Sequence, residues 1–328
     1  MSGNSSNAKD NIPPGRQLIQ EGTVSMLYPK DVVFYNPVQV QNRDLSLFMI
    51  TLYSERRIQR AATRAYKKKL NKEYKAKGEK LHDNSEIKAK METFDKEYKL
   101  TNEYATNIKG VRILDALAAS GLRSLRYHKE IPSSFVHSVT INDLDPAAVD
   151  LAKENISYNN LSHALVECDE ESTKGGICVQ IGDATQVLYN SRRPPNLREP
   201  TIVQQSQKDQ YDVIDLDPYG SAAPFIDGAV QAISNGGMLL VTCTDMAALG
   251  GSHPETCYGR YGSMPITRVG YLQELALRIL LGNLAQRAAV YGRTIRPILS
   301  VGMNFYVRVF VEVWDDKAGV STPQLEQG

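Results

Sequence analysis

The sequence lacks several features that would place it in a class at once. Its 328 residues contain no apolar run near the roughly 20 residues that a membrane-spanning helix needs, so we expect no membrane association. The first residues lack the apolar segment of a secretory signal, which favours an intracellular protein. The four cysteines form no CxxC pair; this pattern argues against a zinc site and favours reduced, mostly buried thiols.

Charge is distributed unevenly along a chain whose formal net charge is only +1. Residues 55–110 carry a net charge of +7, and the rest of the chain carries −6. The basic part has helical propensity, with Tyr66 and Tyr74 between its lysines. Such an asymmetry suggests contact with a polyanion such as RNA, but a solvated helical insertion that binds nothing fits equally well.

Beyond residue 110 the sequence alternates between strand and helix patterns. Buried strands are indicated at 111–119, 138–144, 176–184, 211–217 and 238–245. Helical periodicity separates them, for example after Pro146, which suits a first helical turn. Two last strands at 295–302 and 305–314 can form a hairpin. This order predicts an α/β fold with five parallel strands and then an antiparallel pair, which resembles a class I methyltransferase core.

An aspartate ends or follows each of the five parallel strand patterns. In an open α/β sheet, ligands bind beyond the carboxyl ends of the strands, so these positions decide what the crevice can hold. A single such aspartate is commonly a helix N-cap, but five in register indicate a cofactor site. The five residues are Asp115, Asp143, Asp183, Asp217 and Asp245.

These side chains suit a ligand that carries adenosine. Asp143 can accept both ribose hydroxyls, while Asp183 and the backbone N–H of Ala184 can contact the adenine. Asp115 precedes small residues that let a ligand approach the backbone closely. The turn after it is not GxGxxG, which disfavours a nicotinamide dinucleotide. Arg123 can pair with a ligand carboxylate, or it is a helix-surface arginine.

The fourth strand pattern ends in Asp217-Pro218-Tyr219. This run resembles the motif of methyltransferases that act on amino nitrogens conjugated to a ring, although the second proline of that motif is absent. The lone pair of such a nitrogen is delocalised, and a carboxylate that accepts its N–H bond points the lone pair at a methyl donor. Pro218 fixes the backbone, and Tyr219 offers a face for a flipped base. The same residues can also form an ordinary turn after a strand.

Six segments together resemble the tRNA (guanine-26-N2)-dimethyltransferase family. They are EGTVSMLYPKDVVFYNPVQVQNRDLS, ILDALAASGLRSLRY, INDLDPAAVDLAKENI, QIGDATQVL, DVIDLDPYGSAAPFIDGAVQAI and TCTDMAALGGSHPETCYGRYG. The resemblance spans most of residues 21–314, and the long basic stretch is more typical of eukaryotic, including fungal, members than of archaeal ones. It implies S-adenosyl-L-methionine as the methyl donor, tRNA as the partner and no obligate protein partner, in the nucleus, mitochondrion or cytoplasm.

The resemblance also implies roles for individual residues. The cofactor would contact Arg43, Asp115, Arg123, Asp143, Asp183 and Ala184, without a metal. Asp217 would be the catalytic carboxylate, with Pro218 and Tyr219 shaping the base pocket. Substrate contacts would come from an N-terminal lid containing Phe34, Tyr35 and Asn36, although these residues can equally be a packing anchor.

We expect five consecutive regions. These are a disordered tail (1–20), the lid segment (21–54), a basic, mainly helical insertion (55–110), a methyltransferase core (111–314) and a linker-like tail (315–328). From the same resemblance, we expect that this chain lacks the C-terminal tRNA-binding domain of the family and binds tRNA less tightly for that reason. Two other functions stay open: methylation of an adenine amine in DNA, and non-catalytic tRNA binding.

Overall fold

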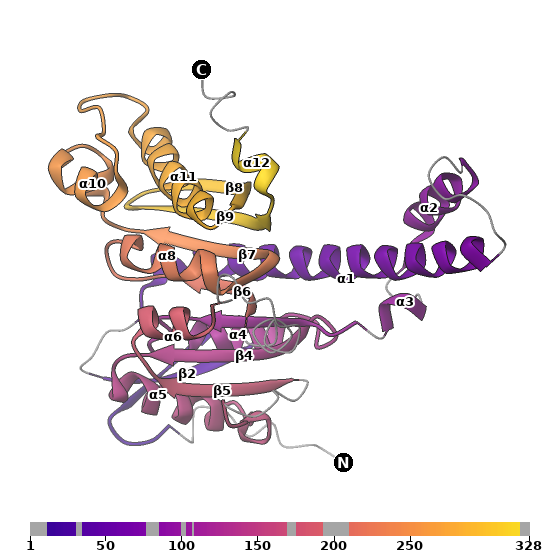
Figure 1. The fold of residues 1–328 in the computed structure, drawn as a ribbon. Helices are drawn as coiled ribbons and strands as arrows, with labels where there is room; N and C mark the ends of the chain where they lie inside the picture. Colours follow the sequence, from indigo (N-terminus) through magenta and orange to yellow (C-terminus); the bar gives the residue numbers. More distant parts are fainter. Residues whose placement is uncertain are drawn as a thin grey trace, which may run out of the picture.

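A seven-stranded mixed sheet forms the centre of the molecule (Figure 1). The computed structural model describes residues 12–30, 35–76, 85–99, 103–106, 108–168, 175–192 and 210–321. Its strand order is β5-β4-β3-β6-β7-β9-β8. The strands are β3 (Val111–Asp115), β4 (Val136–Asp143), β5 (Gly176–Ile181), β6 (Tyr211–Leu216), β7 (Ile233–Cys243), β8 (Arg293–Met303) and β9 (Tyr306–Asp315).

The first five strands of this sheet run parallel, and β9 lies antiparallel to both of its neighbours. This arrangement confirms the predicted methyltransferase-like fold with an antiparallel last strand. Because consecutive side chains of a strand point to opposite faces, each strand contributes to two apolar cores. Ile113 belongs to one core, and its neighbour Leu114 belongs to the other.

Helices cover both faces of the sheet. One face carries α1 (Val40–Ala76), α4 (Leu122–Glu130), α5 (Pro146–Tyr158) and a hairpin of β1 (Arg16–Glu21) and β2 (Val24–Pro29). The other carries α6 (Ala184–Asn190), α8 (Ala223–Ala232) and α11 (Leu272–Val290). The shorter elements are η2 (Pro37–Gln39), α2 (Ser85–Glu97), α3 (Glu103–Thr106), η3 (Ser162–Ala164), α9 (Met246–Leu249), α10 (Pro254–Tyr261) and α12 (Lys317–Ser321).

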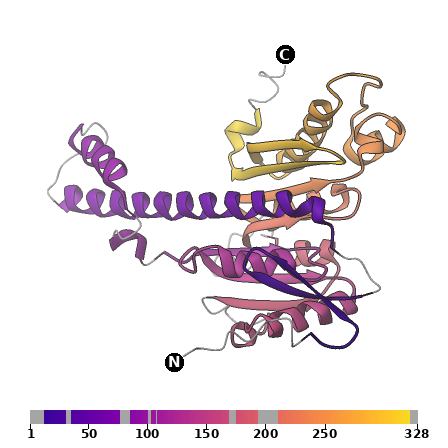
Figure 2. The ribbon, with the colours of Figure 1, turned by 180° about the vertical axis from the view of Figure 1, so that it is seen from behind.

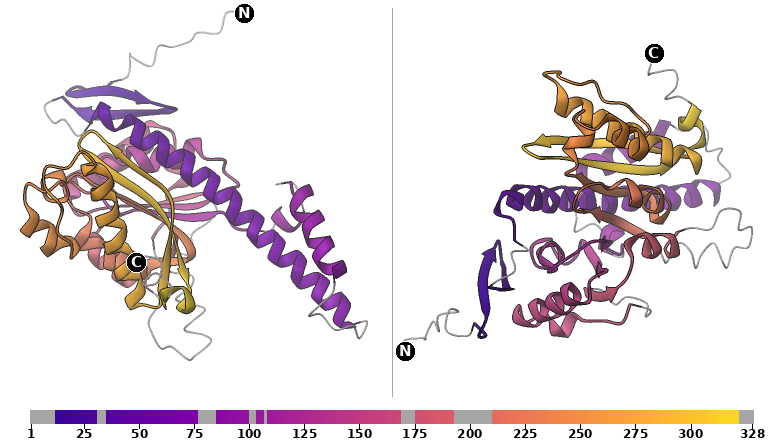
Figure 3. Two further views of the ribbon diagram at one scale, coloured as in Figure 1. Left: turned by 90° about the horizontal axis from the view of Figure 1, so that it is seen from above. Right: turned by 90° about the vertical axis from the view of Figure 1, so that its left-hand side faces the viewer.

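The long helix α1 runs along the sheet and continues well beyond its edge (Figures 1 and 2). Near its first turns, Ser46 contacts Arg123 and Arg308, which pair with aspartates at the C-terminal end of β6. Further along the helix, Arg57 pairs with Asp212 at the N-terminal end of that strand. The last third of α1 therefore projects away from the sheet, with α2 folded back beside it (Figure 3). None of the helices in the described ranges is long and apolar enough to cross a bilayer.

Three expected boundaries need correction. The tail expected to be disordered ends in β1, because residues 16–20 pair with β2. The expected boundary between 54 and 55 falls inside α1, so the lid segment and the basic insertion share one helix. The linker-like tail from 315 begins with the end of β9 and with α12.

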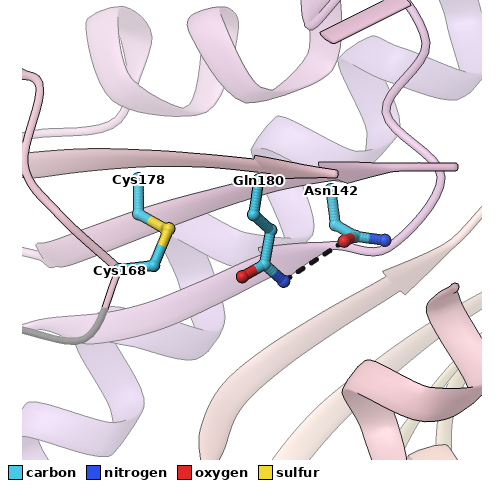
Figure 4. The surroundings of a disulfide bond; sticks show 4 residues. All are labelled: Asn142, Cys168, Cys178 and Gln180. Atoms are coloured by element: carbon cyan, nitrogen blue, oxygen red, sulfur yellow. Dashed lines mark hydrogen bonds between the residues drawn. A yellow bond between two sulfur atoms is a disulfide. The ribbon is translucent and has the colours of Figure 1, made fainter. Parts of the chain in front are cut away.

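The cysteines behave in two ways. Cys168 and Cys178 form a disulfide that ties the segment after η3 to β5 (Figure 4). Their Cα atoms are 5.2 Å apart, within the range that a disulfide spans, so the expectation of reduced thiols is wrong for this pair. Cys243 and Cys257 are buried free thiols, as expected.

Candidate active site

A cluster of buried charged side chains lies at the C-terminal end of β6. The Asp215 and Arg308 side chains are fully buried, and Arg308 Nη2 donates to Asp215 Oδ1 at 2.9 Å. The same Nη2 donates to Ser46 Oγ of α1 at 2.8 Å, and Nη1 donates to the hydroxyl of Thr242 in β7. The Tyr127 hydroxyl donates to Asp215 Oδ2 at 2.5 Å. These bonds hold both charged groups in fixed positions between α1, α4 and the sheet.

Two predicted site residues, Arg123 and Asp217, join this cluster by pairing directly with each other. Arg123 Nη2 donates to Asp217 Oδ2, and Nη1 lies 3.8 Å from Asp215 Oδ2. Burial alone would raise the pKa of Asp217, but the guanidinium groups of Arg123 and Arg308 lower it below its usual value. The Asp217 side chain is still 20% exposed. It is therefore an ionised acceptor that is fixed on one side and accessible on the other.

Asp115 ends β3 next to Asp215 in the parallel ladder. Its Oδ2 accepts a hydrogen bond from Ser124 Oγ at 2.7 Å, but its buried Oδ1 has no partner among the described residues. Burial and the nearby charge of Asp215 raise the pKa of Asp115 to about 7. A buried carboxyl with one unused oxygen is the kind of group that a bound ligand completes. We call Asp115, Arg123, Asp215, Asp217 and Arg308 the strand-end charge cluster.

The two residues after Asp217 differ in burial. Pro218 is buried, whereas Tyr219 is 91% exposed. The next residue, Gly220, has a φ of +82°, which an L side chain rarely adopts. Its amide donates to Thr244 Oγ1 at 2.8 Å, and its carbonyl accepts from the Thr244 amide at 2.8 Å. The turn is thus fastened to the end of β7, and the exposed Tyr219 ring is supported by rigid backbone.

The predicted ribose acceptor Asp143 ends β4 beside the turn that follows β3. Its Oδ2 accepts from the Ala119 amide at 2.7 Å, and its Oδ1 accepts from the Asp145 amide at 3.0 Å. The neighbouring Asn142 donates from Nδ2 to the carbonyls of Ala116 and Gly182, at 3.0 Å each. It therefore ties the ends of three strands together, and its Oδ1 accepts from Gln180 (Figure 4).

The predicted adenine contacts lie where β5 leads into α6. Asp183 is exposed and acts as the N-cap of α6, because its Oδ1 accepts from the Thr185 amide at 2.7 Å. The helix-cap interpretation of a strand-end aspartate is therefore correct here, although the second carboxylate oxygen stays available for a ligand. Ala184 is buried at the first position of α6, whose first amides have no intrahelical acceptor.

The N-terminal candidates form a separate group. Arg43 makes a two-pronged ion pair with Glu21, at 2.6 and 2.5 Å, and also donates to the Asn36 carbonyl. Its guanidinium lies 5.3 Å from the centre of the Tyr35 ring. Asn36 caps η2 by accepting from the Val38 amide. The structure thus joins these residues to one another rather than to the strand-end aspartates, and Phe34 lies outside the described residues.

The sequence-based set missed Asp215 and Arg308. Both carry charge in the middle of apolar strand patterns, VIDL and YVRVFV, and that is the signal that could have revealed them. A charged residue at an interior strand position is costly to bury unless it has a partner. Each is the other's partner here, although 93 positions separate them in the sequence.

The described residues contain no group of three or more histidine, cysteine, aspartate or glutamate side chains arranged to hold a metal ion. The strand order, the single antiparallel strand and the acidic strand ends together define the class I S-adenosylmethionine-dependent methyltransferase fold. Residues 15–325 match the family model of the N2,N2-dimethylguanosine tRNA methyltransferases, and the chain belongs to this family.

Known proteins resemble the chain along most of its length. It is 37% identical over 323 residues to a mouse tRNA (guanine(26)-N(2))-dimethyltransferase, covering 94% of this chain and 43% of that protein. It is 39% identical over 292 residues to the Schizosaccharomyces pombe protein of that name, covering 86% and 46%. The structure of Trm1 from Pyrococcus horikoshii in complex with S-adenosyl-L-methionine matches with a TM-score of 0.64 and 25% identity, covering 93% and 63%. The chain spans about half the length of these curated relatives.

Proposed function

We propose that the chain transfers methyl groups from S-adenosyl-L-methionine to the exocyclic N2 of guanine 26 in tRNA, giving N2,N2-dimethylguanosine. Membership of the family and the names of the relatives support the substrate and the product. The single observation that carries the chemistry is Asp217. Its carboxylate is kept ionised by two arginines, stays partly exposed at the end of β6, and precedes a buried proline and an exposed tyrosine.

The described residues fit the proposed methyl donor. The unpartnered Oδ1 of Asp115 lies at the end of β3, where small residues allow a ligand to approach. Asp143 uses each oxygen for one backbone amide, and a carboxylate oxygen can accept a second hydrogen bond, so Asp143 would still offer acceptors to the ribose hydroxyls. Asp183 and Ala184 at the start of α6 would contact the adenine. When bound, the sulfonium supplies an electrophilic methyl carbon.

Asp217 would act on the amine. The guanine N2 lone pair is delocalised into the ring, so the nitrogen is a weak nucleophile. A carboxylate that accepts one N–H bond in a charge-assisted hydrogen bond favours the geometry that exposes the lone pair. Arg123 and Arg308 keep Asp217 from rotating and from taking up a proton. Because these groups are held before the substrate binds, little reorganisation is needed during the reaction.

Tyr219 would hold the base. A flipped guanine needs a stacking surface to offset the few kcal/mol lost when it leaves the RNA stack. The exposed Tyr219 ring beside Asp217 supplies such a surface, worth about 1–3 kcal/mol per base. We propose that the lid with Tyr35 and Asn36 closes over this base, and that Arg43 orients the lid through its contacts with both residues.

Arg123 has a proposed second role. Its guanidinium has five N–H donors, of which only some are used for Asp217 and Ser46. It can therefore also bind the donor's carboxylate while it continues to hold Asp217.

We propose that this activity takes place in the nucleus, in the mitochondrion or in both, with the cytoplasm as a third compartment where the substrate tRNA is found.

Mass analysis of nucleosides tests the proposal. Unmodified tRNA incubated with the chain and S-adenosyl-L-methionine should yield N2,N2-dimethylguanosine at position 26, and a transcript with adenosine at that position should yield none. Product in duplex DNA instead would establish the adenine-amine alternative. Salt-sensitive tRNA binding without any cofactor affinity or product would establish a non-catalytic module.

A further inference from the structure

The C-terminal part of α1, which includes its projecting end, is strongly basic. Residues 55–76 contain nine lysines and arginines but only two glutamates. Arg57 and Arg60 pair with Asp212 and Glu312 of the sheet, at 2.7 and 2.9 Å. Six other basic side chains are exposed and form no ion pair within the described ranges: Arg56, Arg64, Lys67, Lys68, Lys72 and Lys75.

Four of these side chains lie on one face of the helix. Arg64, Lys68, Lys72 and Lys75 are spaced by four, four and three residues, which places them in a row about 17 Å long. We call this row the basic face. The buried residues Ile58, Ala62 and Leu70 lie on the other side of the helix. The basic face is therefore directed away from the packing surface of α1.

The helix that carries the basic face is rigidly supported. Tyr66 of α1 stacks on Phe94 of α2 with ring centres 4.4 Å apart, and Tyr104 of α3 packs edge-on against both. Tyr74 is buried beside Leu70. The two tyrosines that lie between the lysines in the sequence are thus part of a small core and are not available to stack on bases.

In the absence of a bound partner, repulsion within the basic face lowers the stability of α1. Arg64 and Lys68, and then Lys68 and Lys72, are like-charged pairs four residues apart, and each pair is unfavourable by about 0.2–0.5 kcal/mol. A polyanion relieves this repulsion and gains from releasing its counterions. A fixed row of cations without aromatic neighbours suits regularly spaced phosphates, whereas base recognition would need stacking or base-edge contacts.

We propose that the basic face binds the phosphate backbone of a double-helical part of the tRNA, away from the base that is methylated. This inference rests on the proposed function. Ser46 contacts the strand-end charge cluster, and the basic face begins 18 residues further along the same helix. At 1.5 Å per residue, the face contacts RNA about 27–44 Å from the reaction site. The single helix α1 therefore sets the distance between the two contacts.

A matched pair of triple variants tests the proposal. The arm variant is Arg64→Gln, Lys68→Gln and Lys72→Gln; the control variant is Lys153→Gln, Arg287→Gln and Lys317→Gln, which removes equally exposed charges from α5, α11 and α12. Binding of an unmodified tRNA transcript is measured by fluorescence anisotropy at several salt concentrations. We expect the arm variant to bind about tenfold more weakly and its salt dependence to lose about 2–3 units of slope, since each lost phosphate contact removes about 0.7–0.9. The control variant should match the parent chain.

A second substrate separates this proposal from the proposed function. A stem-loop that carries the target guanine but is too short to reach the basic face should be methylated equally by the parent and by the arm variant. Equal tRNA affinity and equal salt slopes for the parent and the arm variant would overturn the proposal and leave the face as a solvated or protein-binding surface. Absence of methylation by the parent on both RNAs would overturn the proposed function alone, because the binding curves still report on the basic face.

Discussion

The two ends of α1 differ in the kind of charged side chain found there. At its N-terminal end, Ser46 contacts Arg123 and Arg308, whose charges are buried and paired with aspartates. At its C-terminal end, Arg64 and Lys68 are exposed and have no ion pair among the described residues. Buried pairs fix the geometry of a site and reach only a ligand that enters it, whereas exposed, unpaired charges fix little geometry and attract a polyanion. The buried pairs therefore suit a reaction centre, and the exposed charges suit the binding of a large anionic substrate.

The largest expected effect follows from breaking the buried pair. Arg308→Met should reduce the free energy of unfolding by about 3–5 kcal/mol, because Asp215 loses its nearest cationic partner while it stays buried. Arg278→Met is the control, since it breaks an exposed pair with Glu274 and should cost less than about 1 kcal/mol. Urea unfolding of both variants measures the difference. Equal losses would mean that burial does not distinguish the two kinds of charge.

A smaller effect should appear in the pH dependence of stability. The pKa of Asp115 is raised to about 7 in the folded chain, so its folded form holds a proton that the unfolded form has released above about pH 4. Its contribution to stability is therefore full below pH 4 and is lost as the pH rises toward 7. Asp115→Asn mimics the protonated acid, so it should be near neutral below pH 4 and increasingly stabilising as the pH rises from 4 to 7.

Thermal unfolding of the parent and of Asp115→Asn across this range checks the sign. Parallel pH profiles for the two proteins would show that Asp115 does not titrate in the expected window.

The smallest effect concerns the basic face. The Arg64, Lys68 and Lys72 triple variant should change the free energy of unfolding by no more than about 0.5 kcal/mol per site, and toward higher stability, since like charges are removed. Urea unfolding at low salt is the measurement. A large destabilisation would indicate that these side chains support the helix instead of remaining available to a partner.

Local patterns sufficed to predict most of the sheet and the position of three acidic side chains at its strand ends. Apolar runs ending in aspartate place Asp115, Asp143 and Asp217 correctly at strand ends, because strand polarity alone decides which edge they share. The hairpin of β8 and β9 was predicted because the two strand patterns are neighbours in the sequence and Gly302-Met303-Asn304 between them allows a turn.

Long-range pairing could not be predicted in this way. The contact of Arg123 with Asp217 joins positions 94 residues apart, and that of Arg43 with Glu21 depends on how the β1–β2 hairpin lies against α1. The expected split of the chain between 54 and 55 followed charge, but the helix continues through it because Ile58 and Ala62 are buried on the same side as Ile50. Charge composition describes the surface of a helix, whereas its length is decided by the buried side.

The most direct test of the account is the substitution Asp217→Ala, followed by two measurements on the same protein. Calorimetry should show affinity for S-adenosyl-L-methionine close to that of the parent chain, because Asp217 would contact the amine and not the cofactor. Methyl incorporation into unmodified tRNA should fall about 100-fold or more, as when a preorganised transition-state contact is removed. Unchanged incorporation, or loss of cofactor affinity in step with incorporation, would contradict the role of this carboxylate.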